Sequence, residues 1–213
     1  MQFLMSARAD DVAGSAAAVR DDTFRRHEGI DILFHWATAA FVLILIGTGL
    51  LMRMGLQFSW RDFHWISGVG ITLLVAFHLL RSLFWKKLRT IWFTMAELRQ
   101  RQVGKYSVMQ KCMHHALAFV VLMTIVTGLL MLKRIQTPLL ARDPSMFSQG
   151  TWDLVYALHD VATVLAATLV VIHVYFALIP ENWMYLRAMI TGRMSRADQR
   201  ARVAALLKDG RRT

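Results

Sequence analysis

The chain has 213 residues, of which 56% are hydrophobic and 18% charged, and its formal net charge is +11. So high a hydrophobic content excludes an intrinsically disordered chain. The single cysteine, Cys112, excludes a disulfide framework, a four-thiolate iron–sulfur cluster and a Cys-x-x-Cys-His haem attachment. A metal or cofactor must therefore be held by His, Met, carboxylate or backbone groups, and the chain has 8 His.

Four apolar segments predict four transmembrane helices. About 20 apolar residues, rising about 1.5 Å each, cross a hydrocarbon core of about 30 Å. Only the last segment contains a charged residue, Asp160, and all three prolines lie outside the four segments. The segments are residues 32–52, 63–80, 112–132 and 154–179. The predicted fold class is therefore all-α, a transmembrane four-helix bundle.

The domain organisation follows from these spans. We expect an N-terminal segment at 1–28, the transmembrane bundle at 29–180 and a basic tail helix at 181–213. Residues 87–102 and 182–208 mix apolar with basic side chains. Such segments are expected to form surface helices that anionic lipid attracts or that dock against a partner subunit.

The distribution of basic residues predicts the orientation. Twenty of the 25 Lys and Arg lie in the N-terminal segment, the second loop and the tail, which share one side of the membrane. The positive-inside rule then places both termini in the cytoplasm of a bacterial inner membrane. The positive charge thus indicates topology and gives no reason to expect a nucleic-acid partner.

The histidines within the spans have a regular spacing. His64 and His78 are 14 residues apart in the second span, and His159 and His173 are 14 apart in the fourth. Fourteen residues return to nearly the same helix face about 21 Å further along the axis. Because these two helices run in the same direction, His64 and His159 are expected at one depth near the outer face. The inner pair contains His173.

Two levels of paired histidines favour two stacked haems with two axial imidazoles each. Zinc is a weaker interpretation, because it takes three or four ligands at one level. A haem-free transporter or metal sensor is a third hypothesis. The partner of His173 is either His78, which periodicity favours, or His35 at the cytoplasmic end of the first span.

Small and cationic residues fit the same interpretation. Gly68 and other glycines of the spans leave room for a flat macrocycle, although close helix packing also uses small residues. Arg81 and Arg53 lie at opposite helix ends, where each could pair with a haem propionate or anchor the helix at the interface.

Particular stretches resemble the dihaem cytochrome b (gamma) subunit of respiratory formate dehydrogenases, in a wider family with the cytochrome b of nickel–iron hydrogenases. The similarity spans about residues 25–190. It is carried by His-Trp at 35–36, His64 with Gly68, GKYSVMQK at 104–111 and LHDVATVLAATLVVIHVYFAL at 158–178.

The resemblance implies two b haems, one held by His64 and His159 and the other by His35 and His173. It also implies a menaquinone or ubiquinone near the inner haem, beside the start of the third span. The matching residues are Ser107, Gln110, Lys111 and His114.

The implied function is that of a membrane subunit of a respiratory oxidoreductase. Electrons would pass from a partner iron–sulfur subunit, itself fed by a catalytic dehydrogenase subunit, through the two haems to quinone. The whole complex could form a higher oligomer. The alternatives are a hydrogenase cytochrome b subunit and a stand-alone cytochrome b, such as one that oxidises superoxide.

Overall fold

The computed structural model describes residues 22–55, 59–85 and 108–209. The surface helix expected at 87–102 lies outside this part of the chain. The chain separates into two compact units. One is Phe34–Tyr175, and the other combines Met1–Leu33 with Phe176–Thr213.

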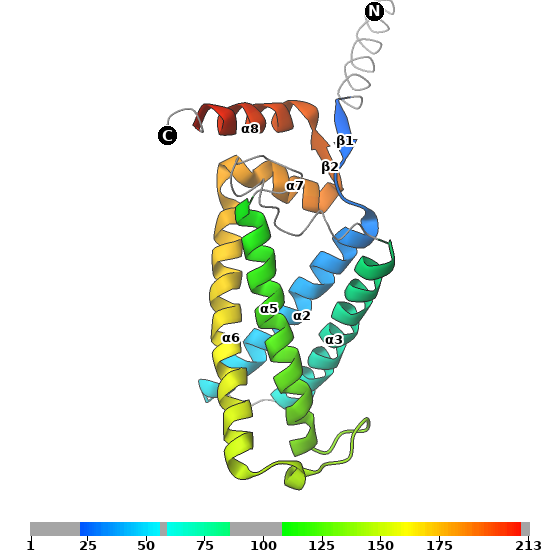
Figure 1. The fold of residues 1–213 in the computed structure, drawn as a ribbon, viewed down its shortest axis with the longest axis vertical. Helices are drawn as coiled ribbons and strands as arrows, with labels where there is room; N and C mark the ends of the chain where they lie inside the picture. Colours follow the sequence, from blue (N-terminus) through cyan, green and yellow to red (C-terminus); the bar gives the residue numbers. More distant parts are fainter. Residues whose placement is uncertain (1–21, 56–58, 86–107, 210–213) are drawn as a thin grey trace, which may run out of the picture. The chain divides into compact units, whose positions relative to one another are not determined.

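Four long helices account for the four predicted spans (Figure 1). Each is long enough and apolar enough to cross a membrane, which confirms the predicted four-helix transmembrane fold. The first three begin three or four residues before the predicted span, and the last begins five residues before it. The helices are α2 (Gly29–Arg53), α3 (Trp60–Trp85), α5 (Val108–Met131) and α6 (Gln149–Leu178).

The bundle buries small residues and exposes large apolar ones. Helices α5 and α6 run side by side (Figure 1) and pack through a core of Val120, Ala162 and Ala166. Alanines let the two backbones approach closely. In contrast, Leu73 is 66% exposed and Val171 is 69% exposed. Large apolar side chains on the outer surface are favourable in contact with lipid tails and unfavourable in contact with water.

The connection between α5 and α6 is folded. It contains two short 3-10 helices, η2 (Leu132–Arg134) and η3 (Pro144–Met146). Trp152, which is only 1% exposed, donates a hydrogen bond from Nε1 to the Pro144 carbonyl at 2.9 Å. The ring of Phe147 contacts the same indole, with centroids 5.2 Å apart. The connection is thereby attached to the first turn of α6.

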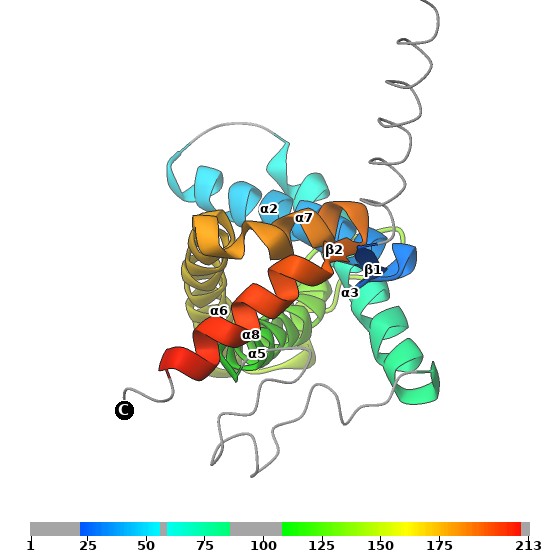
Figure 2. The same ribbon diagram turned by 90° about the horizontal axis from the view of Figure 1, so that it is seen from above.

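The second unit joins the chain before α2 to the chain after α6. Strand β1 (Thr23–Arg25) pairs antiparallel with β2 (Arg193–Ser195), and Figure 2 shows the two strands side by side. After the 3-10 helix η4 (Pro180–Asn182), the tail forms α7 (Trp183–Thr191), then β2, then α8 (Arg196–Asp209). The tail that the sequence predicted as helical is therefore two helices separated by a strand.

Gly192 explains the break between α7 and β2. Its φ of 77° is left-handed, a conformation that glycine adopts without steric cost. Its amide donates to the Ala188 carbonyl at 2.9 Å and closes the helix. Its own carbonyl accepts hydrogen bonds from the backbone N–H groups of Arg26 and His27, at 2.8 and 3.2 Å. One residue thus ends α7 and attaches the N-terminal segment.

Candidate functional site

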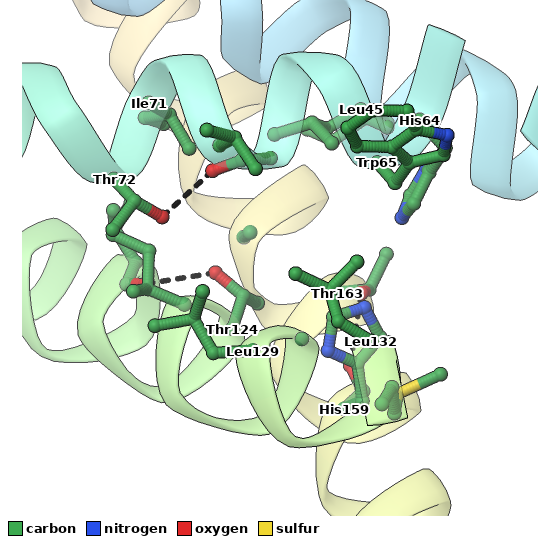
Figure 3. A pocket seen from close by; sticks show the side chains of 18 of the residues that line it. Leu45, His64, Trp65, Ile71, Thr72, Thr124, Leu129, Leu132, His159 and Thr163 are labelled. Carbon is green, nitrogen blue, oxygen red and sulfur yellow. Dashed lines mark hydrogen bonds between the residues drawn. The ribbon is translucent and has the colours of Figure 1, made fainter. Parts of the chain in front are cut away.

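Two histidines from different helices face each other inside the bundle. His64 lies near the start of α3, and His159 lies on α6. Their ring centroids are 6.3 Å apart, with the ring planes inclined by 71°. Figure 3 shows the two side chains on opposite sides of one open space. The structure thus brings together the outer pair that the spacing predicted.

A second histidine pair has the same separation. The ring centroids of His35 on α2 and His173 on α6 are also 6.3 Å apart, and their planes are inclined by 54°. His78 has a different neighbour, because its ring stacks on Phe34 with centroids 4.3 Å apart and planes inclined by 16°. Of the two residues considered as partners of His173, His35 is the one that the structure places opposite it.

The separation of each pair suits one metal ion between two imidazoles. An imidazole nitrogen binds a transition metal at about 2.0–2.1 Å, so two rings on opposite sides of one ion have centroids about 6 Å apart. Within the described part of the chain, no group of three or more His, Cys, Asp or Glu side chains could hold a metal. The donor set therefore fits an iron with four other ligands from a macrocycle better than it fits zinc.

The outer pair opens into a largely apolar cavity of about 360 Å³. This volume lies within the range of about 300–1,000 Å³ that is usual for ligand and cofactor pockets. Gly68, one of the glycines predicted to leave room for a macrocycle, lines this cavity. Two cations, Arg61 and Arg134, lie at the same cavity.

Glycines stand where side chains would meet the histidines. A Cβ on Gly128 would lie 3.4 Å from Cε1 of His159, and one on Gly49 would lie 3.9 Å from Cε1 of His64. Gly70 has another role, because a Cβ there would lie 2.7 Å from the ring of Phe41. Gly128 and Gly49 keep space beside the two imidazoles, whereas Gly70 permits helix packing.

Each outer histidine also contacts a buried threonine through its second ring nitrogen. Nδ1 of His64 lies 2.8 Å from Oγ1 of Thr48, and Nδ1 of His159 lies 2.8 Å from Oγ1 of Thr127. These threonines are not among the site residues predicted from the sequence. A signal was present, since both begin the same five residues, Thr-Gly-Leu-Leu-Met, at 48–52 and 127–131.

A buried hydroxyl on α2 is unsatisfied among the described residues. Thr38 follows His35 by about one helical turn, and its buried Oγ1 has no hydrogen-bond partner among the described residues. Buried polar atoms are usually paired, so such an atom indicates a place where a bound molecule completes the site.

Arg134 lines the outer cavity and adds to the cations that the sequence suggested as propionate partners. Arg81, half-buried, lies at the end of α3 far along the helix from His64. Arg134 instead lines the cavity, and its guanidinium lies 5.2 Å from the ring centroid of Trp152 and 5.9 Å from that of Tyr156. The two aromatic contacts restrain the position of this charge at the cavity.

The residues expected to contact quinone lie at the start of α5, except Ser107, which is outside the described residues. Gln110 is half-buried, Lys111 is 4% exposed and His114 is exposed. The Lys111 carbonyl lies 2.8 Å from Nδ1 of His115, whose ring lies 5.6 Å from that of His114. Gln110 and His114 are one turn apart and share a helix face.

Comparison with known proteins gives one family match. A family model described as prokaryotic cytochrome b561 matches residues 26–192. This range contains all four long helices and all four facing histidines. No curated protein matches the chain significantly.

Proposed function

Because the chain belongs to the prokaryotic cytochrome b561 family, we propose that it is the membrane subunit of a respiratory oxidoreductase and holds two b haems. Membership of this family and the four apolar helices make the chain a multi-pass membrane protein, a b-type cytochrome in electron transfer that binds haem b. The proposal adds the number of haems, their ligands and the electron donor and acceptor.

The observation that carries the proposal is the equal separation of two histidine pairs. His64 and His159 supply one pair, and His35 and His173 supply the other, each with ring centroids 6.3 Å apart. The two residues of each pair would hold the iron of one haem, which supplies one-electron chemistry when it is bound. His159 and His173 are 14 positions apart, which separates the two levels by about 21 Å along the helix.

The residues around the outer histidine pair would contribute space, positive charge and an apolar environment. Gly49 and Gly128 leave space beside the outer imidazoles, and Gly68 lines the cavity. Arg61 and Arg134 supply positive charge where anionic haem propionates would need partners. The apolar lining excludes water, which protects an electron carrier from side reactions.

The acceptor that we propose is a quinone, menaquinone or ubiquinone, at the start of α5. Gln110 and His114 would bind the carbonyl oxygens of its ring, and Lys111 and Ser107 lie in the same segment. His114 would also transfer protons to the quinone, because an imidazole ring can both donate and accept a proton. With both termini in the cytoplasm, this end of α5 faces the cytoplasm, and quinone reduction would take up protons there.

The donor that we propose is a partner iron–sulfur subunit that docks near the outer pair, as in formate dehydrogenase-like complexes. A lone cysteine cannot hold such a cluster within this chain. The dehydrogenase subunit behind it would oxidise formate or hydrogen. A stand-alone cytochrome b would instead purify without other subunits and still reduce quinone.

The deciding experiment is haem quantitation on the purified protein. We expect a reduced-minus-oxidised spectrum of b type and two haems per chain. His64→Ala and His159→Ala should each leave one haem, since each removes a ligand of the same site. A matched control is His27→Ala, which changes a buried histidine outside the bundle. One haem per wild-type chain contradicts the dihaem proposal.

A further inference from the structure

We propose that Thr48 and Thr127 are positioning residues that lower the reduction potential of the haem between His64 and His159. The inference rests on the proposed function, because it concerns one of the two proposed haems. Both threonines are almost fully buried, Thr48 at 7% and Thr127 at 4% exposure. Each is held by its helix and reaches a histidine on a different helix.

The hydrogen bonds determine where the protons lie. Oγ1 of Thr48 is 2.7 Å from the Ile44 carbonyl, and Oγ1 of Thr127 is 2.7 Å from the Met123 carbonyl. A carbonyl can only accept, so each hydroxyl donates its single proton along its own helix. The same oxygen then accepts a hydrogen bond from the nearby imidazole Nδ1.

This arrangement fixes the tautomer of both histidines. With Nδ1 protonated, Nε2 of His64 and Nε2 of His159 each carry a free lone pair. Nε2 is then the nitrogen that would hold the haem iron. The contact also holds each ring in one orientation, because the hydroxyl is itself attached to a rigid helix.

The two contacts are two copies of one local sequence. Thr-Gly-Leu-Leu-Met occurs near the outer end of α2 and again near the outer end of α5. In each copy the threonine contacts an imidazole Nδ1, and the following glycine, Gly49 or Gly128, has the same imidazole as its nearest side chain. Because both copies make the same contacts, chance is a poor explanation for them.

The inner pair lacks this contact. Among the described residues, neither His35 nor His173 has a hydrogen bond to its ring. A hydrogen bond from Nδ1–H makes an imidazole a stronger donor to the metal, which stabilises ferric over ferrous iron. These hydrogen bonds would therefore lower the reduction potential of the outer haem relative to that of the inner haem. This difference in potential would favour electron transfer from the His64–His159 level toward the His35–His173 level.

The test compares Thr48→Val and Thr127→Val with Thr48→Ser and Thr127→Ser in the full-length protein. Valine keeps the shape of threonine and removes the hydroxyl, whereas serine keeps the hydroxyl. Thr168→Val is the matched control, because Thr168 also bonds to its own helix, at the Val164 carbonyl, and lies outside the cavity. The readouts are haem content, redox titration of each haem and the electron paramagnetic resonance of the ferric protein.

We expect each valine variant to raise the reduction potential of one of the two haems. The ratio of ferrous to ferric iron at a fixed potential should rise about tenfold, or about 59 mV for one electron. The other haem should keep its potential, and the resonance of the ferric outer haem should move. The serine variants and Thr168→Val should match the wild type.

The outcomes separate this inference from the proposed function. Two haems with unchanged potentials in both valine variants overturn it. Loss of the outer haem in the valine variants supports it when the serine variants keep that haem, and contradicts it when the serine variants lose it too. A wild-type protein with fewer than two haems contradicts the proposed function itself, before any variant is compared.

Discussion

Phe34 and His78 stack nearly parallel, with ring centroids 4.3 Å apart and planes inclined by 16°. The stacking turns one face of the His78 imidazole toward an aromatic neighbour on α2. His35, the next residue after Phe34, faces His173 instead. Adjacent residues on α2 thus contact two different histidines, and only one of these contacts has the separation that two axial ligands of one iron require.

The first prediction concerns the inner haem. His35→Ala should remove half of the haem absorbance, because it deletes one of the two imidazoles opposite each other. His78→Ala should keep both haems, and His78→Phe is a control that preserves the stacking with Phe34. Absorbance after haem extraction measures the difference. The reverse result would assign the ligand to His78.

A second prediction uses the space beside His159. In Gly128→Leu, the new side chain must displace the imidazole or fill the cavity, because even a Cβ would lie 3.4 Å from Cε1 of His159. We expect loss of the outer haem with the inner haem retained. Gly47→Leu is the matched control on α2, because a Cβ there meets no atom within 4 Å. Equal haem content in the two variants would contradict this role for Gly128.

A third prediction concerns the folded connection before α6. Trp152→Ala should destabilise the protein by about 3–5 kcal/mol, since it empties a buried aromatic site. Trp152→Phe should destabilise the protein less than Trp152→Ala, because it removes the hydrogen bond to the Pro144 carbonyl and part of the ring volume but keeps an aromatic ring in the site. Thermal unfolding in detergent measures both. Leu154→Ala on the same helix is the control, as Leu154 is 59% exposed, and an equal loss there would contradict the assignment.

A fourth prediction tests the orientation. Cysteines introduced in a Cys112→Ser background should react with a membrane-impermeant thiol reagent from opposite sides. Ser145→Cys lies in the exposed connection between α5 and α6, and Ala201→Cys lies in the exposed part of α8. We expect labelling of the first in intact cells and of the second only after the inner membrane is opened. Labelling of Ala201→Cys in intact cells would place the tail outside.

The sequence by itself determined the four spans and the depth of the histidines. Span length follows from the thickness of a bilayer, so hydropathy alone located α2, α3, α5 and α6. Axial position follows from a fixed rise per residue. The second and fourth spans run in the same direction and each carries two histidines 14 residues apart, which indicated that His64 and His159 lie at one level. Local composition did not reveal the break in the tail. The break at Gly192 accompanies the pairing of β2 with β1, and β1 lies far away in the sequence.

Only the tertiary structure decided which side chains meet across helices. A helical sequence fixes the angle of each residue about its own axis, but packing fixes how one helix is rotated against the next. That rotation turned His35, rather than His78, toward His173. It also brought the Thr48 and Thr127 hydroxyls to histidines 16 and 32 residues away. Arg134, in the connection between α5 and α6, also lines the outer cavity, and its guanidinium contacts the buried ring of Trp152.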